Sequence, residues 1–214
     1  MLTVDAIFFD LDGTLVDARQ AIVNAANYTL AKMGRPGKTF EEVVSYVGTG
    51  VSYLVSKSLG SEDPKLVEEG VRIYIEYYTA HPADNAVIYP HVKETLDFFR
   101  AKRKFILTNR YVNLTIPLLR ATGLEKYFEE VIGGDDEKCL KPSPCVFGNI
   151  LPRLRVDKKR AIIAGDMAVD IMAGKNSGIA TCWMTYGLSK LEDLGGVKPD
   201  YILDDIAGLK KIIK

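Results

Sequence analysis

Two aspartates that stand one residue apart, Asp10 and Asp12, are the first residues in the chain that could carry out chemistry. They lie in the stretch AIFFDLDGTLVD, residues 6–17, directly after an apolar run. Carboxylates this close repel each other unless a cation or a proton neutralises them. We expect Mg²⁺ to be that cation, because it is a hard ion that takes oxygen ligands and commonly works beside phosphate. Gly13 lets the backbone turn sharply, so that its amide can approach an anion.

A second acidic pair follows far downstream, in the stretch AIIAGDMAVD. Asp166 again ends an apolar run, and Asp170 lies one helical turn further along the chain. Ligands of open α/β sheets bind at the carboxyl ends of the strands. We therefore expect the strands before Asp10 and Asp166 to be neighbours, so that the two acidic pairs meet at one edge of the sheet.

Two further polar groups stand at comparable places in the chain. Thr108 and Asn109 follow the apolar run KFIL, and Lys141 lies in the loop KCLKPSP, where Pro142 restricts it to an extended backbone. A lysine in an acidic magnesium site would balance charge and bind a phosphate as a point charge. Taken singly, each of these residues has a plain structural explanation, such as a helix N-cap, an Asx-turn or a surface lysine. The ordered set of four groups is what predicts an active site.

The elements that must position these residues alternate between short apolar runs and helical patterns. Such alternation is typical of βαβ units and of a doubly wound, Rossmann-like α/β fold with a mainly parallel sheet. The runs that we expect to form strands cover residues 4–9, 104–107, 130–132, 160–164, 181–184 and 201–203.

One segment breaks the alternation, because no convincing strand pattern appears between Asp17 and about His81. We interpret residues 16–82 as an inserted helical subdomain, and residues 1–15 and 83–214 as the α/β core domain. We expect hinges near residues 15–16 and 81–84. The loop Gly48, Thr49 and Gly50 interrupts the helices. It is either a substrate loop that faces the active site or a plain turn between helices, and the sequence leaves both open.

Composition narrows the class of protein. The 214 residues are enough for one core with a small insert, and 47% apolar with 26% charged residues is ordinary for a globular chain. The 28 basic and 28 acidic residues cancel, which gives no electrostatic reason to expect nucleic acid or an anionic membrane as a partner. Neither a membrane-spanning run nor a signal peptide is recognisable, so we expect a cytoplasmic protein. The oligomeric state, monomer or homodimer, is unknown from the sequence.

Cysteine and histidine are scarce. Cys139, Cys145 and Cys182 are odd in number and lack the spacing of a metal site, so we expect three reduced thiols. With only two histidines and no cysteines in a metal-type spacing, we do not expect a zinc site.

The ordered set DLDGT, TN, KP and GDMAVD resembles the four motifs of the haloacid dehalogenase superfamily of phosphotransferases. The resemblance covers nearly the whole chain, and the helical insert is similar to the C1-type cap of that superfamily. It implies that Asp10 is the nucleophile that becomes phosphorylated and that Asp12 is the general acid/base.

The resemblance also implies a magnesium site and a phosphate site. The residues implied to bind the phosphoryl group are Thr108, Asn109, Lys141 and Gly13. The implied metal ligands are Asp10, Asp12 and Asp166, with Asp170 in support of the metal site.

Other stretches narrow the choice within the superfamily. The presence of Asp12 favours phosphate chemistry, because the hydrolytic dehalogenases of the superfamily lack an aspartate there. The stretches VGTGVSYLVSKSL, VIGGDD and TYG resemble the bacterial phosphatases of 2-phosphoglycolate, which implies that small phosphorylated metabolite as substrate. Met167 departs from the usual pattern, in which a small polar residue often follows the first aspartate of the fourth motif.

Several alternatives remain at this point. A pyrophosphatase, a phosphosugar phosphatase or a phosphomutase of the same superfamily would keep the same core motifs. The run from Gly48 to Val51 holds no arginine, which weakens the mutase interpretation. A receiver or binding module that carries phospho-aspartate is an alternative of a different class, although it would need neither a large cap nor an acid/base at Asp12.

Overall fold

The computed structural model describes residues 1–214 and contains a six-stranded sheet in the order β5-β4-β1-β6-β7-β8. Every neighbouring pair in this sheet is parallel. Its strands are β1 (Ala6–Phe9), β4 (Arg103–Leu107), β5 (Glu130–Ile132), β6 (Ala161–Gly165), β7 (Ala180–Met184) and β8 (Tyr201–Leu203). The predicted doubly wound parallel fold is confirmed, and so is the expected pairing of β1 with β6.

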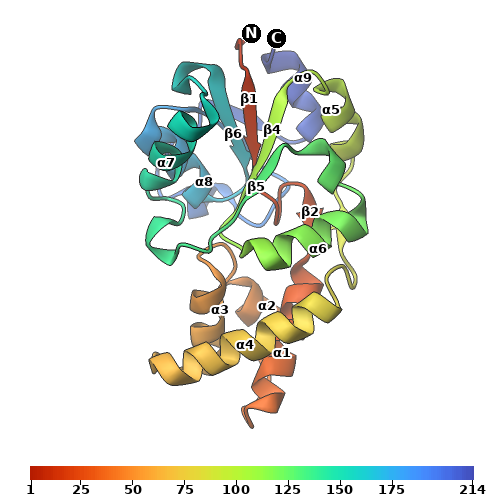
Figure 1. The fold of residues 1–214 in the computed structure, drawn as a ribbon, viewed down its shortest axis with the longest axis vertical. Coiled ribbons are helices and arrows are strands. Elements are labelled where there is room, and N and C mark those ends of the chain that lie inside the picture. The colour runs from red at the N-terminus through yellow and green to blue at the C-terminus, as the bar shows by residue number, and fades with distance from the viewer.

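Helices cover both faces of the sheet, which explains why its central strands read as unbroken apolar runs. In β1, Ile7 and Phe9 face one core cluster while Ala6 and Phe8 face the other. Helices α5 (Val92–Phe98), α6 (Val112–Thr122) and α9 (Leu209–Ile212) pack on the first face. Helices α7 (Cys145–Leu154) and α8 (Ala168–Ser177) pack on the second face (Figure 1).

Short 3-10 helices link several of these elements. They span Glu125–Tyr127, Glu137–Cys139, Lys158–Arg160, Leu191–Leu194 and Ile206–Gly208.

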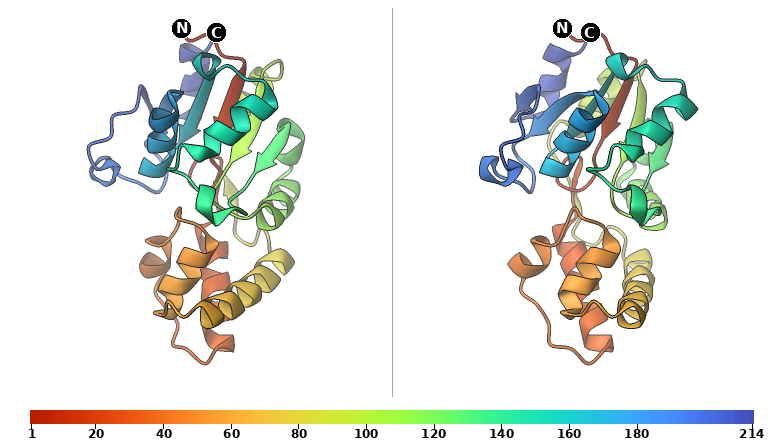
Figure 2. Two further views of the ribbon diagram at one scale, coloured as in Figure 1. Left: turned by 60° about the vertical axis from the view of Figure 1, so that its left-hand side comes forward. Right: turned by 90° about the vertical axis from the view of Figure 1, so that its left-hand side faces the viewer.

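Four helices between β1 and β4 form a separate group at the carboxyl ends of the strands (Figures 1 and 2). They are α1 (Arg19–Lys32), α2 (Phe40–Val44), α3 (Val51–Leu59) and α4 (Pro64–Ala80), hereafter the helical segment. Local signals set their ends: Thr39 and Glu42 form a capping box at α2, and Asp63 caps α4 ahead of Pro64. The helical segment has its own apolar core, to which Leu114 of α6 also belongs. No helix of the chain combines the length and apolarity that a bilayer crossing requires.

A two-stranded antiparallel ribbon joins the helical segment to the rest of the chain. Strand β2 (Val16–Asp17) pairs with β3 (Val87–Ile88), so that Val16 lies opposite Ile88. Neither strand was predicted from the sequence, because two residues are too few to show a periodic pattern and Val87 is 63% exposed.

The cysteines correct one expectation. Cys139 and Cys145 form a disulfide bond, so the prediction of three reduced thiols is wrong for this pair. The loop between them reverses the chain ahead of α7, and this turn brings the two Cα atoms to 5.7 Å. Cys182, in β7, is a free and buried thiol.

The packing against β1 allows a test of the core. Phe147 of α7 is fully buried, and its ring edge meets Phe8 at a centroid distance of 5.1 Å. We expect Phe147→Ala to lower the free energy of unfolding by about 3–5 kcal/mol, through lost burial and the cavity left behind. The matched control is Phe98→Ala, because Phe98 is 59% exposed and its removal is expected to cost about 0.5 kcal/mol or less. Equal losses in urea denaturation would contradict this view of the core.

Candidate active site

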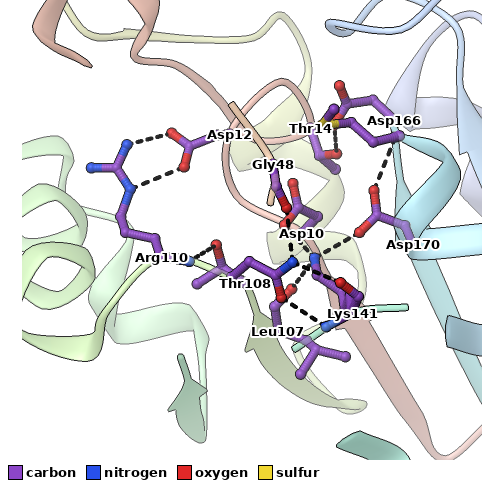
Figure 3. A network of polar contacts seen from close by, with 12 residues as sticks. Asp10, Asp12, Thr14, Gly48, Leu107, Thr108, Arg110, Lys141, Asp166 and Asp170 are labelled. Atoms are coloured by element: carbon purple, nitrogen blue, oxygen red, sulfur yellow. Dashed lines mark hydrogen bonds and ion pairs between the residues drawn. The ribbon is translucent and has the colours of Figure 1, made fainter. Parts of the chain in front are cut away.

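Three adjacent strands deliver the polar residues of the candidate active site to one edge of the sheet. Asp10 follows β1 at the centre, Thr108 follows β4 on one side, and Asp166 follows β6 on the other. Since the strands are parallel, these residues leave the sheet at the same edge, which faces the helical segment in Figure 1, and Figure 3 shows them gathered there.

Asp10, Asp166 and Asp170 form a compact acidic cluster in which all three residues are buried. One carboxylate oxygen from each lies within 4.8 Å of the others. Helix α8 begins directly after Met167, so Asp170 falls in its first turn and accepts a hydrogen bond from the Met167 amide at 2.9 Å. The close approach depends on Gly165, since a Cβ there would lie 2.3 Å from Cγ of Asp170.

Lys141 is the cation that joins this cluster. Its Nζ donates to Oδ1 of Asp10 and Oδ1 of Asp170, both at 2.6 Å, and to the carbonyl oxygen of Leu107 at 2.7 Å. These three bonds use all three donors of the ammonium group. Asn109 fixes the backbone of Lys141, because its Oδ1 accepts from the lysine amide at 2.8 Å and its Nδ2 donates to the lysine carbonyl at 2.9 Å.

The cluster carries more negative charge than Lys141 neutralises. Burial raises the pKa of Asp10 from 3.8 to about 7, although Lys141 acts in the opposite direction. Burial likewise raises the pKa of Asp166, and the charges of Asp10 and Asp170 add to the effect. Three carboxylates and one ammonium leave two negative charges when all are ionised. An all-oxygen donor set with this charge fits a hard divalent cation.

Asp166 is oriented from several sides. Its Oδ1 accepts from the Thr14 hydroxyl at 2.8 Å, and its Oδ2 accepts from the Leu188 amide at 2.7 Å. Gly13 packs against it with a φ of +88°, and a Cβ on Gly13 would lie 2.3 Å from Oδ2 of Asp166. Glycine is therefore required at position 13 both by conformation and by space.

Asp12 lies outside the acidic cluster and binds Arg110 instead. Nε and Nη2 of Arg110 donate to the two carboxylate oxygens of Asp12 at 3.0 and 2.7 Å (Figure 3). Both side chains are buried. Burial acts to lower the pKa of Arg110, but the charge of Asp12, the nearby Tyr78 and Tyr74 and the hydrogen bonds to Asp12 together raise it. Arg110 was not predicted to belong to the site. The available signal was its place directly after Thr108 and Asn109, at the same strand end.

The loop of residues 48–50 lies at the site. The carbonyl oxygen of Gly48 accepts from Nδ2 of Asn109 at 2.8 Å, and a Cβ on Gly48 would lie 2.4 Å from the sulfur of Met167. Gly48 and Gly50 line a pocket that also contains Asp10 and Thr108. Thr49 is exposed and does not line this pocket. Met167, the departure from the usual fourth motif, therefore contacts the helical segment.

Comparison with known proteins places this geometry in a family. Residues 7–184 match the model of the haloacid dehalogenase-like hydrolases. The chain is 32% identical to a phosphoglycolate phosphatase of Chromobacterium violaceum, over 99% of this chain and 97% of that protein. It is 30% identical to a phosphoglycolate phosphatase of Vibrio parahaemolyticus, over 98% and 96%.

A solved structure agrees in fold over the same length. The crystal structure of a predicted phosphoglycolate phosphatase from Haemophilus somnus superposes with a TM-score of 0.90, at 27% identity, and covers 99% of each chain. The acidic cluster and its lysine agree with the match over most of the sequence. The chain belongs to the haloacid dehalogenase-like hydrolase family.

Proposed function

We propose that the chain is a magnesium-dependent phosphomonoesterase that hydrolyses 2-phosphoglycolate through an aspartyl-phosphate on Asp10. The observation that carries the proposal is the buried carboxylate of Asp10, which lies beside Asp166 and Asp170 and accepts a hydrogen bond from Lys141. Asp10 also lines a pocket between the sheet and the helical segment. The names of the relatives from Chromobacterium and Vibrio support the choice of substrate.

The reaction takes two displacements at phosphorus. A carboxylate oxygen of Asp10 attacks, an acyl phosphate bond forms, and the bond from phosphorus to the glycolate oxygen breaks. Asp12 in its acid form gives its proton to the leaving oxygen. Asp12 then takes a proton from water, which attacks the aspartyl-phosphate, releases inorganic phosphate and restores Asp10.

The remaining residues bind and orient the phosphoryl group. Asp10, Asp166 and Asp170 would hold Mg²⁺, which when bound supplies positive charge to the phosphoryl oxygens. Lys141, the Thr108 hydroxyl and the backbone amide of Gly13 are proposed to contact the same oxygens. Asn109 is proposed to act chiefly by fixing Lys141 through the two bonds between them. The ligand role predicted for Asp12 stays a prediction, since its carboxylate binds Arg110 in this structure.

We propose further that residues 16–82 act as a cap over the core of residues 1–15 and 83–214. The bond from Asn109 to the carbonyl of Gly48 supports this, because it joins the helical segment to a residue beside Lys141. Such a cap would exclude water while phosphorus is attacked. The proposed partner is a small phosphorylated metabolite, and no nucleic acid or membrane partner is proposed. The proposed location is the cytoplasm.

The proposal is tested by phosphate release from a panel of esters, with and without Mg²⁺. The panel contains 2-phosphoglycolate, hexose phosphates, nucleotides, an aryl phosphate and inorganic pyrophosphate. We expect magnesium-dependent turnover with 2-phosphoglycolate ahead in kcat/KM. Another leading substrate would point to a phosphosugar phosphatase, a pyrophosphatase or a mutase. Phosphorylation of Asp10 without turnover of any compound would favour a receiver module.

Replacing the nucleophile gives a sharper test of the mechanism. We expect Asp10→Asn to lower kcat by a factor on the order of 10⁴ or more, and to abolish the acid-stable phosphoenzyme, because an amide cannot form the acyl phosphate. Asp204→Asn is the matched control, since Asp204 is exposed and distant in sequence from all the motifs. Near-normal turnover in Asp10→Asn would remove Asp10 from the role of nucleophile.

The pKa shifts predict how pH and Mg²⁺ act on stability. The pKa of Asp10 is raised by burial from 3.8 to about 7, so the metal-free folded state binds more protons than the unfolded chain between these pH values. Its free energy of unfolding therefore falls as pH rises through that window, and Asp166 contributes in the same direction. We expect Mg²⁺ to raise the Tm more at pH 7.5 than at pH 5, because it competes with these protons. A Tm increment that does not change with pH, measured against EDTA, would contradict the metal site.

A further inference from the structure

The Arg110 guanidinium is the one cation of the site that the reaction as described leaves without a task. It lies at the end of β4, in contact with the helical segment, where its Cζ is 4.5 Å from the centre of the Tyr78 ring. Only 7% of Arg110 is exposed. Its Nε and Nη2 bind Asp12, but Nη1 is buried without any hydrogen-bond partner. In Figure 3 this nitrogen points away from Asp12.

An unpartnered nitrogen on a buried guanidinium indicates a missing acceptor. Arginine has five N–H donors and no acceptor, so one carboxylate cannot satisfy it. Buried polar groups are paired in the great majority of cases, so each exception needs an explanation. The hydroxyl of Tyr78, whose ring contacts Arg110, is also buried without a partner, so two unpaired groups lie side by side here. The acceptor that fits best is a second carboxylate, because guanidinium and carboxylate match in planar, two-point geometry.

Arg110 is the one cation of the pocket that is not assigned to the phosphoryl group. Of the side chains that line the pocket, only those of Lys141 and Arg110 are cationic. Lys141 is bonded to Asp10, Asp170 and the Leu107 carbonyl, and the proposed function assigns it to the phosphoryl oxygens. The helical segment contributes no charge to this lining, since its residues there are Ile22, Val47, Gly48, Gly50, Val51, Leu54 and Tyr74.

We propose that Arg110 recognises a carboxylate on the substrate through Nη1 and the second N–H of Nη2, beside its contact with Asp12. The inference rests on the proposed function and adds the residue that selects the substrate. In 2-phosphoglycolate the carboxyl carbon is attached to the carbon that bears the leaving oxygen. The substrate carboxylate and the carboxylate of Asp12 must therefore be neighbours during the reaction, and one guanidinium can reach both.

The contact with Asp12 gives this recognition a consequence for rate. Both oxygens of Asp12 accept from Arg110, so a substrate carboxylate on the same guanidinium would lie next to Asp12. The carbon that bears the leaving oxygen would then be placed close to the proposed proton donor. A phosphate ester without a carboxylate lacks this positioning contact, so discrimination is expected in kcat as well as in KM.

The experiment compares 2-phosphoglycolate with the phosphate ester of glycolamide, in which a neutral carboxamide replaces the carboxylate, at saturating Mg²⁺. We measure kcat and KM for wild type, Arg110→Gln and Arg110→Lys. The matched control is Arg120→Gln, because Arg120 is 67% exposed in its side chain and pairs with Glu125 on the surface. We expect wild type and Arg120→Gln to prefer the carboxylate by about 10- to 100-fold, the scale of one charge-assisted contact in a buried site.

In Arg110→Gln we expect the preference to fall to within about threefold of unity, with an intermediate value in Arg110→Lys, which keeps the charge but loses the two-point geometry. Inhibition by glycolate is measured beside inhibition by inorganic phosphate. A loss confined to glycolate supports recognition of the carboxylate. Equal losses with both esters and both inhibitors would overturn the proposal, and would leave Arg110 as a positioning residue for Asp12.

The two proposals fail in different ways. If wild type hydrolyses neither ester, the proposed phosphatase function is wrong. If wild type hydrolyses both esters without preferring the carboxylate, or if the Arg110 variants keep the wild-type preference, only the role of Arg110 is wrong. Circular dichroism and the magnesium-dependent Tm shift establish whether each variant is folded with an intact acidic cluster.

Discussion

Repulsion between buried carboxylates is the constraint on which the rest of the site depends. Asp10, Asp166 and Asp170 are brought together at the centre of the sheet, where burial makes their charges costly. The ammonium group of Lys141 contacts two of them, and the second cation, Arg110, binds Asp12 separately. The strand order places these groups, and the charge that remains after pairing is what a divalent cation would balance. Fold and chemistry are therefore linked through one electrostatic requirement.

Much of the fold could be predicted from the sequence, because its parallel strands are buried on both faces and read as apolar runs. β5 and β8 begin and end at the predicted residues, and the ends of the other four strands differ by one or two residues. The helices of the inserted segment could be predicted from apolar spacing, and in the structure caps at Thr39 and Asp63 begin two of them. What the pattern could not predict were contacts made by few residues, namely the β2–β3 ribbon and the disulfide between Cys139 and Cys145.

The candidate site shows the same division. Parallel strand ends must meet at one edge, so the proximity of Asp10, Asp166 and Asp170 could be expected from spacing. Lys141 lies in a loop well past the end of β5, and only its place in the ordered set of motifs indicated the site. The partner of Asp12 could not, because an arginine after a strand has many directions open to it. In the structure the Arg110 guanidinium packs over the Tyr78 ring and makes two hydrogen bonds to Asp12. Position in the chain predicts which edge a side chain reaches, and tertiary contacts decide which neighbour it binds.

The ribbon of β2 and β3 has a mechanical consequence for the whole molecule. The chain crosses between the sheet and the helical segment twice, and Val16 and Asp17 are paired with Ile88 and Val87 at those crossings. Two unpaired linkers would let the helical segment slide and rotate in many directions. A hydrogen-bonded pair moves as a single strap, which bends and twists but resists shear between its strands. The opening of the proposed cap would thereby be limited to rotations about this one short ribbon, in which Val16 is also bridged to Asp12.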